Sequence, residues 1–380
     1  MLIAFIKVSR KKITNLGSNS LKIPLLIIRP KKKLRSIKLQ KKELLKNKSQ
    51  TQKTEPVITI ICGIHGDETS ALRVIKQLLE KINLARGEIR IVLFANPLAM
   101  MNKSRFISSE GIDINRIFPG NEKSISGLTA KKILELCKTS NCVIDIHNFE
   151  MRTPLMGIVV NSADKLLNEK NISIAKIFAP KQIWLIDASK KEENKFSGSL
   201  GSELNKLKIT NIALELNHPL IVTTKQIDEC CDGLLRIMDS FSMLKSQLTK
   251  DELNSKLIAE LNLKSIIALK LNTRSKLKKV LNLRSDFKPN KTLVKKSEFN
   301  SEFIFNRKGI IAPRSGLFVS DKKLFSKVNK NDVLGKIFDF ELQRELEIIS
   351  PIKGRVMQIA CNKFVFSGDE ILAIGMEVKK

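Results

Sequence analysis

The sequence predicts an α/β domain of three layers with a mixed sheet, followed by a smaller all-β unit. From residue 57 to about residue 243, short apolar runs alternate with segments of helical period, as strands and helices do in an α/β sheet. Two of the chain's three His residues stand at the ends of apolar runs that are expected to be strands. In open α/β sheets, catalytic groups collect at the carboxyl ends of the strands. The last eighty residues contain an internal repeat of short apolar runs, which indicates a separate β unit.

The elements can be assigned in order along the chain. Residues 1–55 are expected to form N-terminal strands and a basic loop, because the apolar run 22–29 precedes the Lys-rich stretch 31–53. The α/β domain over 56–243 then begins with a βαβ unit. Its expected elements are strand 57–62, helix 68–82, strand 89–95, loop 96–122, helix 128–138, strands 142–147 and 155–160, helix 163–178, strand 182–186, helix 198–207, strand 210–216 and helix 226–243.

A connector and a repeat follow this domain. Residues 244–300 are rich in Lys, Leu and Asn and show helical periods with few turn residues, so we expect a partly helical connector. In the β unit at 301–380, segment 312–318 resembles segment 350–356, and a second apolar element follows each copy at a similar distance. Two related sets of short strands predict a sandwich or flattened barrel with a pseudo-twofold axis.

The repeat resembles the biotinyl/lipoyl-type domain. A carrier version of that domain needs a modifiable Lys on the turn between its two halves, but residues 338–349 contain none. We therefore expect a structural role for the β unit, in which it covers the active site or mediates assembly. Formation of a homo-oligomer stays open on the sequence.

The chain is strongly basic, with 68 Lys and Arg against 38 Asp and Glu and a formal net charge of +30. A charge of this size suggests nucleic acid or an anionic membrane as a partner. The basic residues are spread over the whole chain, however, and aromatic residues for base stacking are sparse, with one Trp and no Tyr. We therefore expect solvated basic faces, no specific nucleic-acid partner, and weak polyanion binding at low salt.

The Cys residues indicate a reducing compartment, and the hydropathy of the chain indicates neither a membrane span nor a secretory signal. The six Cys residues form no CxxC pair and have no regular spacing, so they read as buried thiols. No apolar run approaches the ~18 residues of a membrane span, and the apolar start of the chain is too short for a secretory signal. The sequence predicts a cytoplasmic protein with no membrane partner.

His65 and Glu68 follow the apolar run 57–62, where a buried strand turns into a helix. An imidazole and a carboxylate three residues apart can converge on one cation, and the neighbouring glycines permit a tight backbone between them. His147 ends a second apolar run and would be the third ligand. Two His and one Glu with an open fourth position describe a hydrolytic zinc site, so we expect one Zn²⁺ per chain.

The loop between the two His strands carries polar side chains that suit a substrate. Asn115 and Arg116 are adjacent and offer a fork of donors to a carboxylate, and Arg105 can polarise a carbonyl. Asn followed by Arg is a common pair of residues. By itself, the pair is explained equally well by a surface salt bridge that involves the Arg as by a substrate-binding role.

Four motifs follow one another along the chain in an order that is typical of a known family. They are His-Gly-Asp-Glu at 65–68, Asp-Ile-Asn-Arg-Ile-Phe-Pro-Gly at 113–120, Asp-Ile-His at 145–147, and Glu215. This order resembles the succinylglutamate desuccinylase/aspartoacylase family, a branch of the zinc carboxypeptidase-like hydrolases. The resemblance covers about 55–240. The C-terminal repeat resembles the tail of family members that deacetylate N-acetylated amino acids. The resemblance therefore implies a zinc-carboxypeptidase-like fold for the α/β domain.

The resemblance also implies roles for individual residues. His65, Glu68 and His147 would bind zinc. Glu215 would be the general base, because a nearby carboxylate can accept a proton from water whose pKa is lowered and deliver it to the leaving nitrogen. The loop residues would act on the substrate, with its carboxylate held by Asn115 and Arg116 and its oxyanion stabilised by Arg105.

The chain departs from the family pattern close to the expected site. Residues 216–219, which follow Glu215, are Leu-Asn-His-Pro where many relatives have Gly. Glu150 adds a negative charge near the expected substrate entrance. His218 is read as a loop residue, with a substrate contact or a ligand role as alternatives. These departures leave the substrate open.

The sequence thus predicts a zinc-dependent amidohydrolase that removes an acyl group from a small N-acylated amino acid by cleaving a linear amide. One alternative is a zinc carboxypeptidase acting on peptides, although the chain has no Tyr to place at a terminal carboxylate, as such peptidases usually do. Another alternative is a polyanion-binding protein on an inactive hydrolase scaffold. The identity of the acyl group and of the amino acid stays open.

Overall fold

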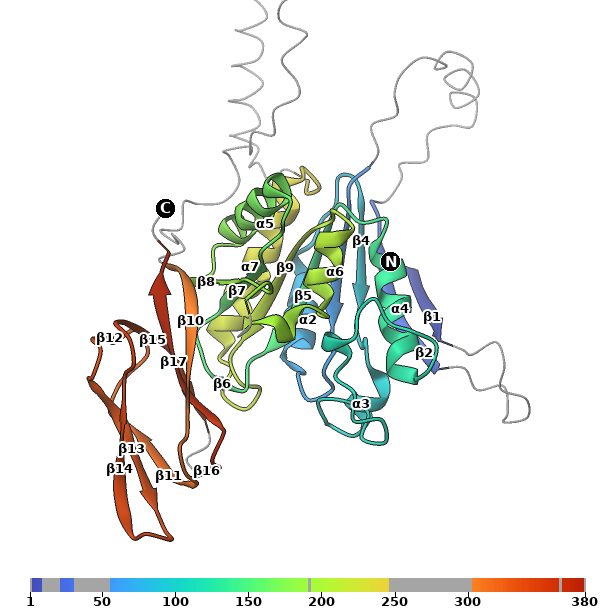
Figure 1. Ribbon diagram of the computed structural model, residues 1–380. Coiled ribbons are helices and arrows are strands. Elements are labelled where there is room, and N and C mark those ends of the chain that lie inside the picture. The colour runs from blue at the N-terminus through green and yellow to red at the C-terminus, as the bar shows by residue number, and fades with distance from the viewer. Residues whose placement is uncertain are drawn as a thin grey trace, which may run out of the picture.

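The structure is a computed structural model that describes residues 2–8, 21–30, 55–190, 193–245, 303–361 and 364–378. Figure 1 shows one large sheet that runs through the molecule, with helices on its faces and a second, smaller sheet at one end. The Lys-rich stretch 31–53 and all but the start of the expected connector 244–300 lie outside the described residues.

The large sheet has thirteen strands and is mixed, as the sequence predicts. Its central strands run parallel in the order β4 (Glu88–Val92), β3 (Val57–Cys62), β5 (Cys142–Asn148) and β9 (Thr210–Leu216). One side is completed by two antiparallel strands, β2 (Leu21–Ile28) and β1 (Leu2–Val8). On the other side, β9 pairs antiparallel with β7 (Met156–Val160), which pairs parallel with β8 (Gln182–Ile186).

Helices on both faces of this sheet make three layers. One face is covered by α2 (Ser70–Lys81), α5 (Lys165–Phe178) and α7 (Thr224–Ser240), and the other by α4 (Ile125–Cys137) and α6 (Leu200–Lys206). Each helix buries an apolar stripe against the strands, because apolar residues recur at intervals of three and four. No helix in the described ranges is long and apolar enough to cross a membrane.

Side chains at the helix starts explain where these helices begin. Ser124, Asp164 and Thr223 precede α4, α5 and α7, and each accepts a hydrogen bond from a backbone N–H of the first turn. Such caps satisfy N–H groups that have no partner within the helix. The observed helices therefore begin close to the positions that the apolar pattern predicts.

Two expectations between β3 and α4 are wrong in detail. The helix expected from residue 68 begins at Ser70, so Glu68 lies in the loop before α2. The expected loop 96–122 contains two short helices, α3 (Pro97–Met101) and η1 (Ile114–Arg116). Side-chain acceptors at Asn96 and Asp113 start these helices, and such local bonds leave no mark on the apolar period.

The C-terminal β unit is a sandwich of two sheets, as the repeat predicts. The large sheet continues beyond β8 with β10 (Phe303–Ile311), β17 (Glu370–Glu377), β15 (Gly354–Ala360) and β12 (Lys327–Val328). A separate four-stranded sheet has the order β14 (Arg344–Ile349), β13 (Val333–Asp339), β11 (Gly316–Ser320) and β16 (Phe364–Val365). One copy of the repeat supplies β11 and β13, and the other supplies β15 and β17, so the two copies face each other across an apolar core.

The β unit is joined to the α/β domain through the sheet itself. β10 pairs parallel with β8 from Phe303 to Phe305, and the two-residue strand β6 (Met151–Arg152) pairs with β15. Phe305 and Met357 also pack in one buried cluster with Trp184. This continuity brings residues of the β unit next to the carboxyl ends of the parallel strands.

Candidate active site

His65 and Glu68 lie in the loop that joins β3 to α2. Gly63 begins this loop with a φ of +70°, which Gly adopts without steric cost. A Cβ atom at Gly66 would lie 2.1 Å from the carbonyl carbon of Ala99, so the absent side chain allows α3 to pack against the loop. These two glycines let the chain turn sharply and place both polar side chains at the carboxyl end of the sheet.

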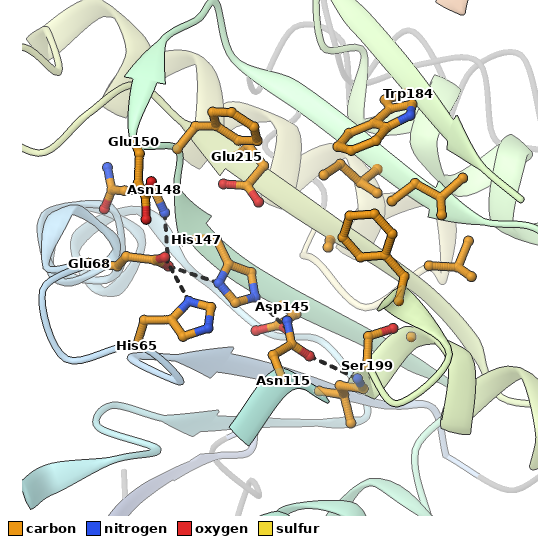
Figure 2. A pocket seen from close by; sticks show the side chains of 18 of the residues that line it. His65, Glu68, Asn115, Asp145, His147, Asn148, Glu150, Trp184, Ser199 and Glu215 are labelled. Carbon is orange, nitrogen blue, oxygen red and sulfur yellow. Dashed lines mark hydrogen bonds and ion pairs between the residues drawn. The ribbon is translucent and has the colours of Figure 1, made fainter. Parts of the chain in front are cut away.

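His65, Glu68 and His147 converge on one point, as Figure 2 shows. Glu68 Oε1 lies 2.7 Å from His65 Nδ1, and Glu68 Oε2 lies 2.8 Å from His147 Nδ1. All three side chains are buried, and one ligand atom from each lies within 4.8 Å of the others. Two imidazoles and a carboxylate at this spacing can hold a single metal ion.

The outer nitrogen of each imidazole faces a carboxylate. His65 Nε2 lies 3.1 Å from Asp113 Oδ1, and His147 Nε2 lies 2.7 Å from Asp145 Oδ2. A proton on Nε2 that is held by a carboxylate leaves the Nδ1 lone pair directed at the centre, which is the tautomer that a metal ligand needs. The donor set of this site therefore fits a divalent ion such as Zn²⁺.

The charges at the centre also favour a cation. Burial opposes ionisation of Glu68, but the two imidazoles outweigh it and hold the pKa of this carboxyl well below its usual range. Burial likewise acts to lower the pKa of His147, but Asp145 and Glu68 reverse this effect and raise the pKa well above its ordinary value. Carboxylates that attract protons to the imidazoles attract a metal ion for the same reason.

Glu215 faces the same cavity from β9. It is the register partner of His147 on β5, and Figure 2 shows its carboxylate next to His147, on the side away from His65. The Oε2 atom is enclosed and has no hydrogen-bond partner among the described residues. Burial raises the pKa of this carboxyl to about 8, although the neighbouring His147 opposes the rise. A carboxyl with such proton affinity suits general acid–base chemistry.

Arg105 is held between two carboxylates. Its Nη2 donates to Asp113 Oδ2 over 3.1 Å, and its Nη1 lies 3.4 Å from Glu68 Oε1. Glu150, which is 77% exposed, lies 3.8 Å from the same Nη1 at the cavity entrance. Arg105 is therefore fixed close to the His–Glu–His cluster.

Asn115 and Arg116 lie beside this cluster in η1. Asn115 Oδ1 accepts the backbone N–H of Leu200 over 2.9 Å, which leaves its Nδ2 group as a donor. The Arg116 guanidinium lies over the ring of Phe196, 4.9 Å from the ring centroid, and donates to the Asn115 carbonyl. Both side chains thus have restricted positions and free donor capacity beside the cavity.

A cavity of about 510 Å³ connects all of these side chains. Its lining includes every residue that the sequence analysis proposes for the site: His65, Glu68, Arg105, Asn115, Arg116, His147 and Glu215. The β unit forms part of the wall. Arg307 of β10 lies over Trp184 at 4.9 Å from the ring, and it pairs with Glu370 of β17.

Sequence reasoning missed two parts of this site. Asp113 orients His65, and the signal was its place two residues before Asn115 in the same motif. Arg307 reaches the cavity wall from the β unit, and no local pattern reveals that contact. His218 does not line the cavity, and its Nδ1 accepts the backbone N–H of Leu220.

The fold and the site define a class: a three-layer α/β protein with a candidate metal centre at the carboxyl ends of its parallel strands. A family model described as the succinylglutamate desuccinylase/aspartoacylase catalytic domain matches residues 54–241. The chain belongs to the succinylglutamate desuccinylase/aspartoacylase family, which is a family of deacylases.

Curated relatives match a shorter segment. A succinylglutamate desuccinylase of Pseudomonas fluorescens strain Pf-5 is 37% identical over 84 residues, which are 21% of this chain and 24% of that protein. A succinylglutamate desuccinylase of Shewanella frigidimarina is 34% identical over 76 residues, 19% of this chain and 21% of that protein. The aligned segment spans less than a quarter of the length of these relatives.

Solved structures share the fold over nearly the whole chain. A succinylglutamate desuccinylase/aspartoacylase from Rhodobacter sphaeroides superposes with a TM-score of 0.71 at 15% identity and covers 100% of this chain and 96% of its own. The product-bound ectoine utilization protein EutE (DoeB) from Ruegeria pomeroyi has a TM-score of 0.69 at 15% identity, covering 99% and 95%. At these identities the likeness establishes the fold alone.

Proposed function

We propose that this protein is a zinc-dependent hydrolase that removes an acyl group from a small N-acylated amino acid. The observation that carries the proposal is the convergence of His65, Glu68 and His147 beside a carboxyl, Glu215, that has an unpaired oxygen. His65, Glu68 and His147 would hold the zinc ion, which would lower the pKa of water and polarise a carbonyl group. Membership of a deacylase family supports the same reaction class.

Glu215 is the residue that moves the proton in this proposal. Its enclosed Oε2 atom faces the cavity and has no hydrogen-bond partner among the described residues, so the atom can exchange a proton with water or substrate. Burial raises the pKa of this carboxyl, which helps it to hold a transferred proton until the leaving nitrogen takes it up. The amide then breaks into a free amine and a carboxylic acid.

The substrate is held by the loop residues. Asn115 Nδ2 and the Arg116 guanidinium bind the substrate carboxylate, because together they present several N–H donors that are fixed by Leu200 and Phe196. Arg105 stabilises the oxyanion that develops at the carbonyl. A cavity of about 510 Å³ accommodates a small molecule and gives little room for an extended peptide, which favours a deacylase over a carboxypeptidase.

A substrate panel tests the proposal. Zinc-loaded protein is incubated with acetyl-, succinyl- and formyl-amino acids and with unblocked peptides, and release of primary amine is measured. We expect hydrolysis of at least one N-acyl amino acid and none of the peptides. Cleavage of peptides alone would assign the carboxypeptidase function instead, and no hydrolysis of any compound would favour an inactive scaffold.

Substitution of a ligand separates the metal from the rest of the site. His65→Ala is expected to reduce bound zinc, measured by mass spectrometry of the metal, from about one ion per chain to near zero and to abolish amine release. Lys76→Ala on the exposed side of α2 is the matched control, since Lys76 pairs with Glu80 at the surface. Full activity of His65→Ala would refute the assignment.

A further inference from the structure

Part of the outer face of the four-stranded sheet in the β unit is unusual because it is apolar. Side chains of an antiparallel sheet alternate between the core and the solvent, and those facing solvent are normally polar. In β11, β13 and β16 the inward residues, such as Phe318 and Ile337, are buried in the sandwich core. The outward positions of the same three strands carry Leu317, Val319, Phe338 and Phe364.

The register of the strands gathers these outward side chains into one patch. Leu317 pairs with Phe338 on one side and with Phe364 on the other. Phe340 contacts Phe338 at a ring distance of 5.0 Å, and Phe366 contacts Phe364 at 5.5 Å. We call the resulting surface the aromatic face; its members are Leu317, Val319, Phe338, Phe340, Phe364 and Phe366.

The aromatic face is exposed. Phe340, Phe364 and Phe366 expose 59%, 50% and 65% of their surfaces, and Val319 exposes 55%. With an aromatic side chain of ~200 Å², the face presents on the order of 500 Å² of apolar surface, which is at the upper end of what a monomer tolerates. Two such faces with their polar rims approach the ~1,200 Å² of a stable interface.

The shape of the face suits a second copy of itself. A hollow lies beside the patch and is lined by Phe340, Phe364 and Arg314, among others. Phe366, the most exposed of the aromatic residues, stands next to this hollow without lining it. In an isologous interface each copy supplies both a projecting ring and a hollow, and this face carries both.

Charge beside the aromatic face disfavours an acidic macromolecule as the partner. The outward positions of β13 and β14 beside the patch carry one basic residue, Lys336, and two acidic residues, Glu345 and Glu347. Lys336 pairs with Glu345 over 2.9 Å, so this edge is locally negative on a chain of net charge +30. An acidic macromolecule would meet like charge here.

We propose that the aromatic face joins two copies of this chain into a homodimer, in which Phe366 of each copy enters the hollow beside Phe340 and Phe364 of the other. The interface buries the outer sheet of both β units. The active-site cavity reaches the β unit at Val365 and Asp369, but none of the six residues of the aromatic face lines it.

Analytical ultracentrifugation of the full chain between about 1 and 100 μM tests the dimer. We expect twice the chain mass of 42.9 kDa. Phe366→Glu and Phe340→Glu each place a carboxylate in the apolar contact and are expected to weaken dimerisation at least tenfold. Leu166→Glu is the matched control, because Leu166 is 62% exposed on α5 and far from this sheet in the chain order. It should leave the mass of the dimer unchanged.

Thermal unfolding distinguishes a lost interface from a lost fold. Phe366→Ser is a milder variant that removes the projecting ring without adding charge, and it should lower dimer affinity while circular dichroism stays unchanged. A wild-type chain that stays at the monomer mass at 100 μM would overturn the proposal and assign the face to another partner. A dimer that persists in both Glu variants would overturn it equally, since the contact would then lie on another surface.

Discussion

At the residue scale, each imidazole of the site lies within hydrogen-bond distance of carboxylate oxygens. Glu68 lies between the inner nitrogens of His65 and His147, while Asp113 and Asp145 face the outer nitrogens. This arrangement sets both tautomers, so that each imidazole directs a lone pair at the same point. The geometry therefore separates the residues proposed to hold a metal from those proposed to orient its ligands.

Asp113→Asn is expected to weaken zinc binding about 10- to 100-fold, because a neutral amide accepts the His65 proton less strongly than a carboxylate does. Competition with a chelating dye at fixed pH measures the affinity. Asp67→Asn is the control, since Asp67 is exposed in the same loop as His65. Equal zinc affinity in wild type and Asp113→Asn would show that the 3.1 Å contact does not orient the ligand.

Glu215→Gln separates proton transfer from metal binding. We expect kcat to fall about 10²- to 10⁴-fold, because the amide cannot take up a proton, while zinc content stays at the wild-type level. Glu150→Gln also removes a carboxylate near the cavity, but Glu150 is 77% exposed and should leave kcat within about threefold. A Glu215→Gln enzyme that keeps its full kcat would transfer the general-base role to another group.

At the element scale, short segments between the main strands and helices position the site. The loop from β3 to α2 carries two of the three proposed metal ligands, and η1 carries both proposed carboxylate-binding residues. α3 packs so closely on the first of these loops that Gly66 has no room for a side chain. Backbone contact between loops, rather than side-chain packing, thus maintains the spacing of the ligands.

Gly66→Ala is expected to destabilise the protein by about 3 kcal/mol or more, because its Cβ atom would overlap backbone atoms of Ala99 and Met100 that cannot move aside cheaply. Gly111→Ala is the control. No atom lies within 4 Å of a Cβ at Gly111, so the cost there is only the strain of its positive φ, about 1 kcal/mol. Urea unfolding measures both, and equal losses would contradict the packing argument.

At the scale of the whole molecule, the sheet is continuous from the α/β domain into the β unit. β10 pairs with β8, and the buried cluster at this junction contains Trp184 from one part and Phe305 from the other. The same junction brings Arg307 to the wall of the cavity. The β unit therefore completes the site as well as presenting the aromatic face.

This continuity predicts that both parts of the chain unfold together. Separating them would expose the edge of β8 and the buried rings at the junction, so neither part should survive alone when the other unfolds. We expect a single transition in differential scanning calorimetry. Two resolved transitions, one of which leaves the zinc site intact, would contradict the prediction.

The main elements of the α/β domain could be predicted from the sequence because their signals are local. The apolar runs at 142–147, 182–186 and 210–216 became β5, β8 and β9 with nearly the same bounds, since a fully buried strand must be apolar along its length. The repeat in the last eighty residues likewise predicted two facing sheets. The short helices in 96–122 were missed, because capping bonds and not apolar periods produce them.

By itself the sequence determined the kinds of side chain that reach the carboxyl ends of the strands, because strand alternation and strand ends are local properties. Only the tertiary structure decided which of them meet. Asp113 lies 48 positions from His65, and Arg307 lies on a strand whose pairing with β8 joins segments more than a hundred residues apart. Such contacts arise from strand order and packing, which depend on the free energy of the whole fold and not on any short stretch of residues alone.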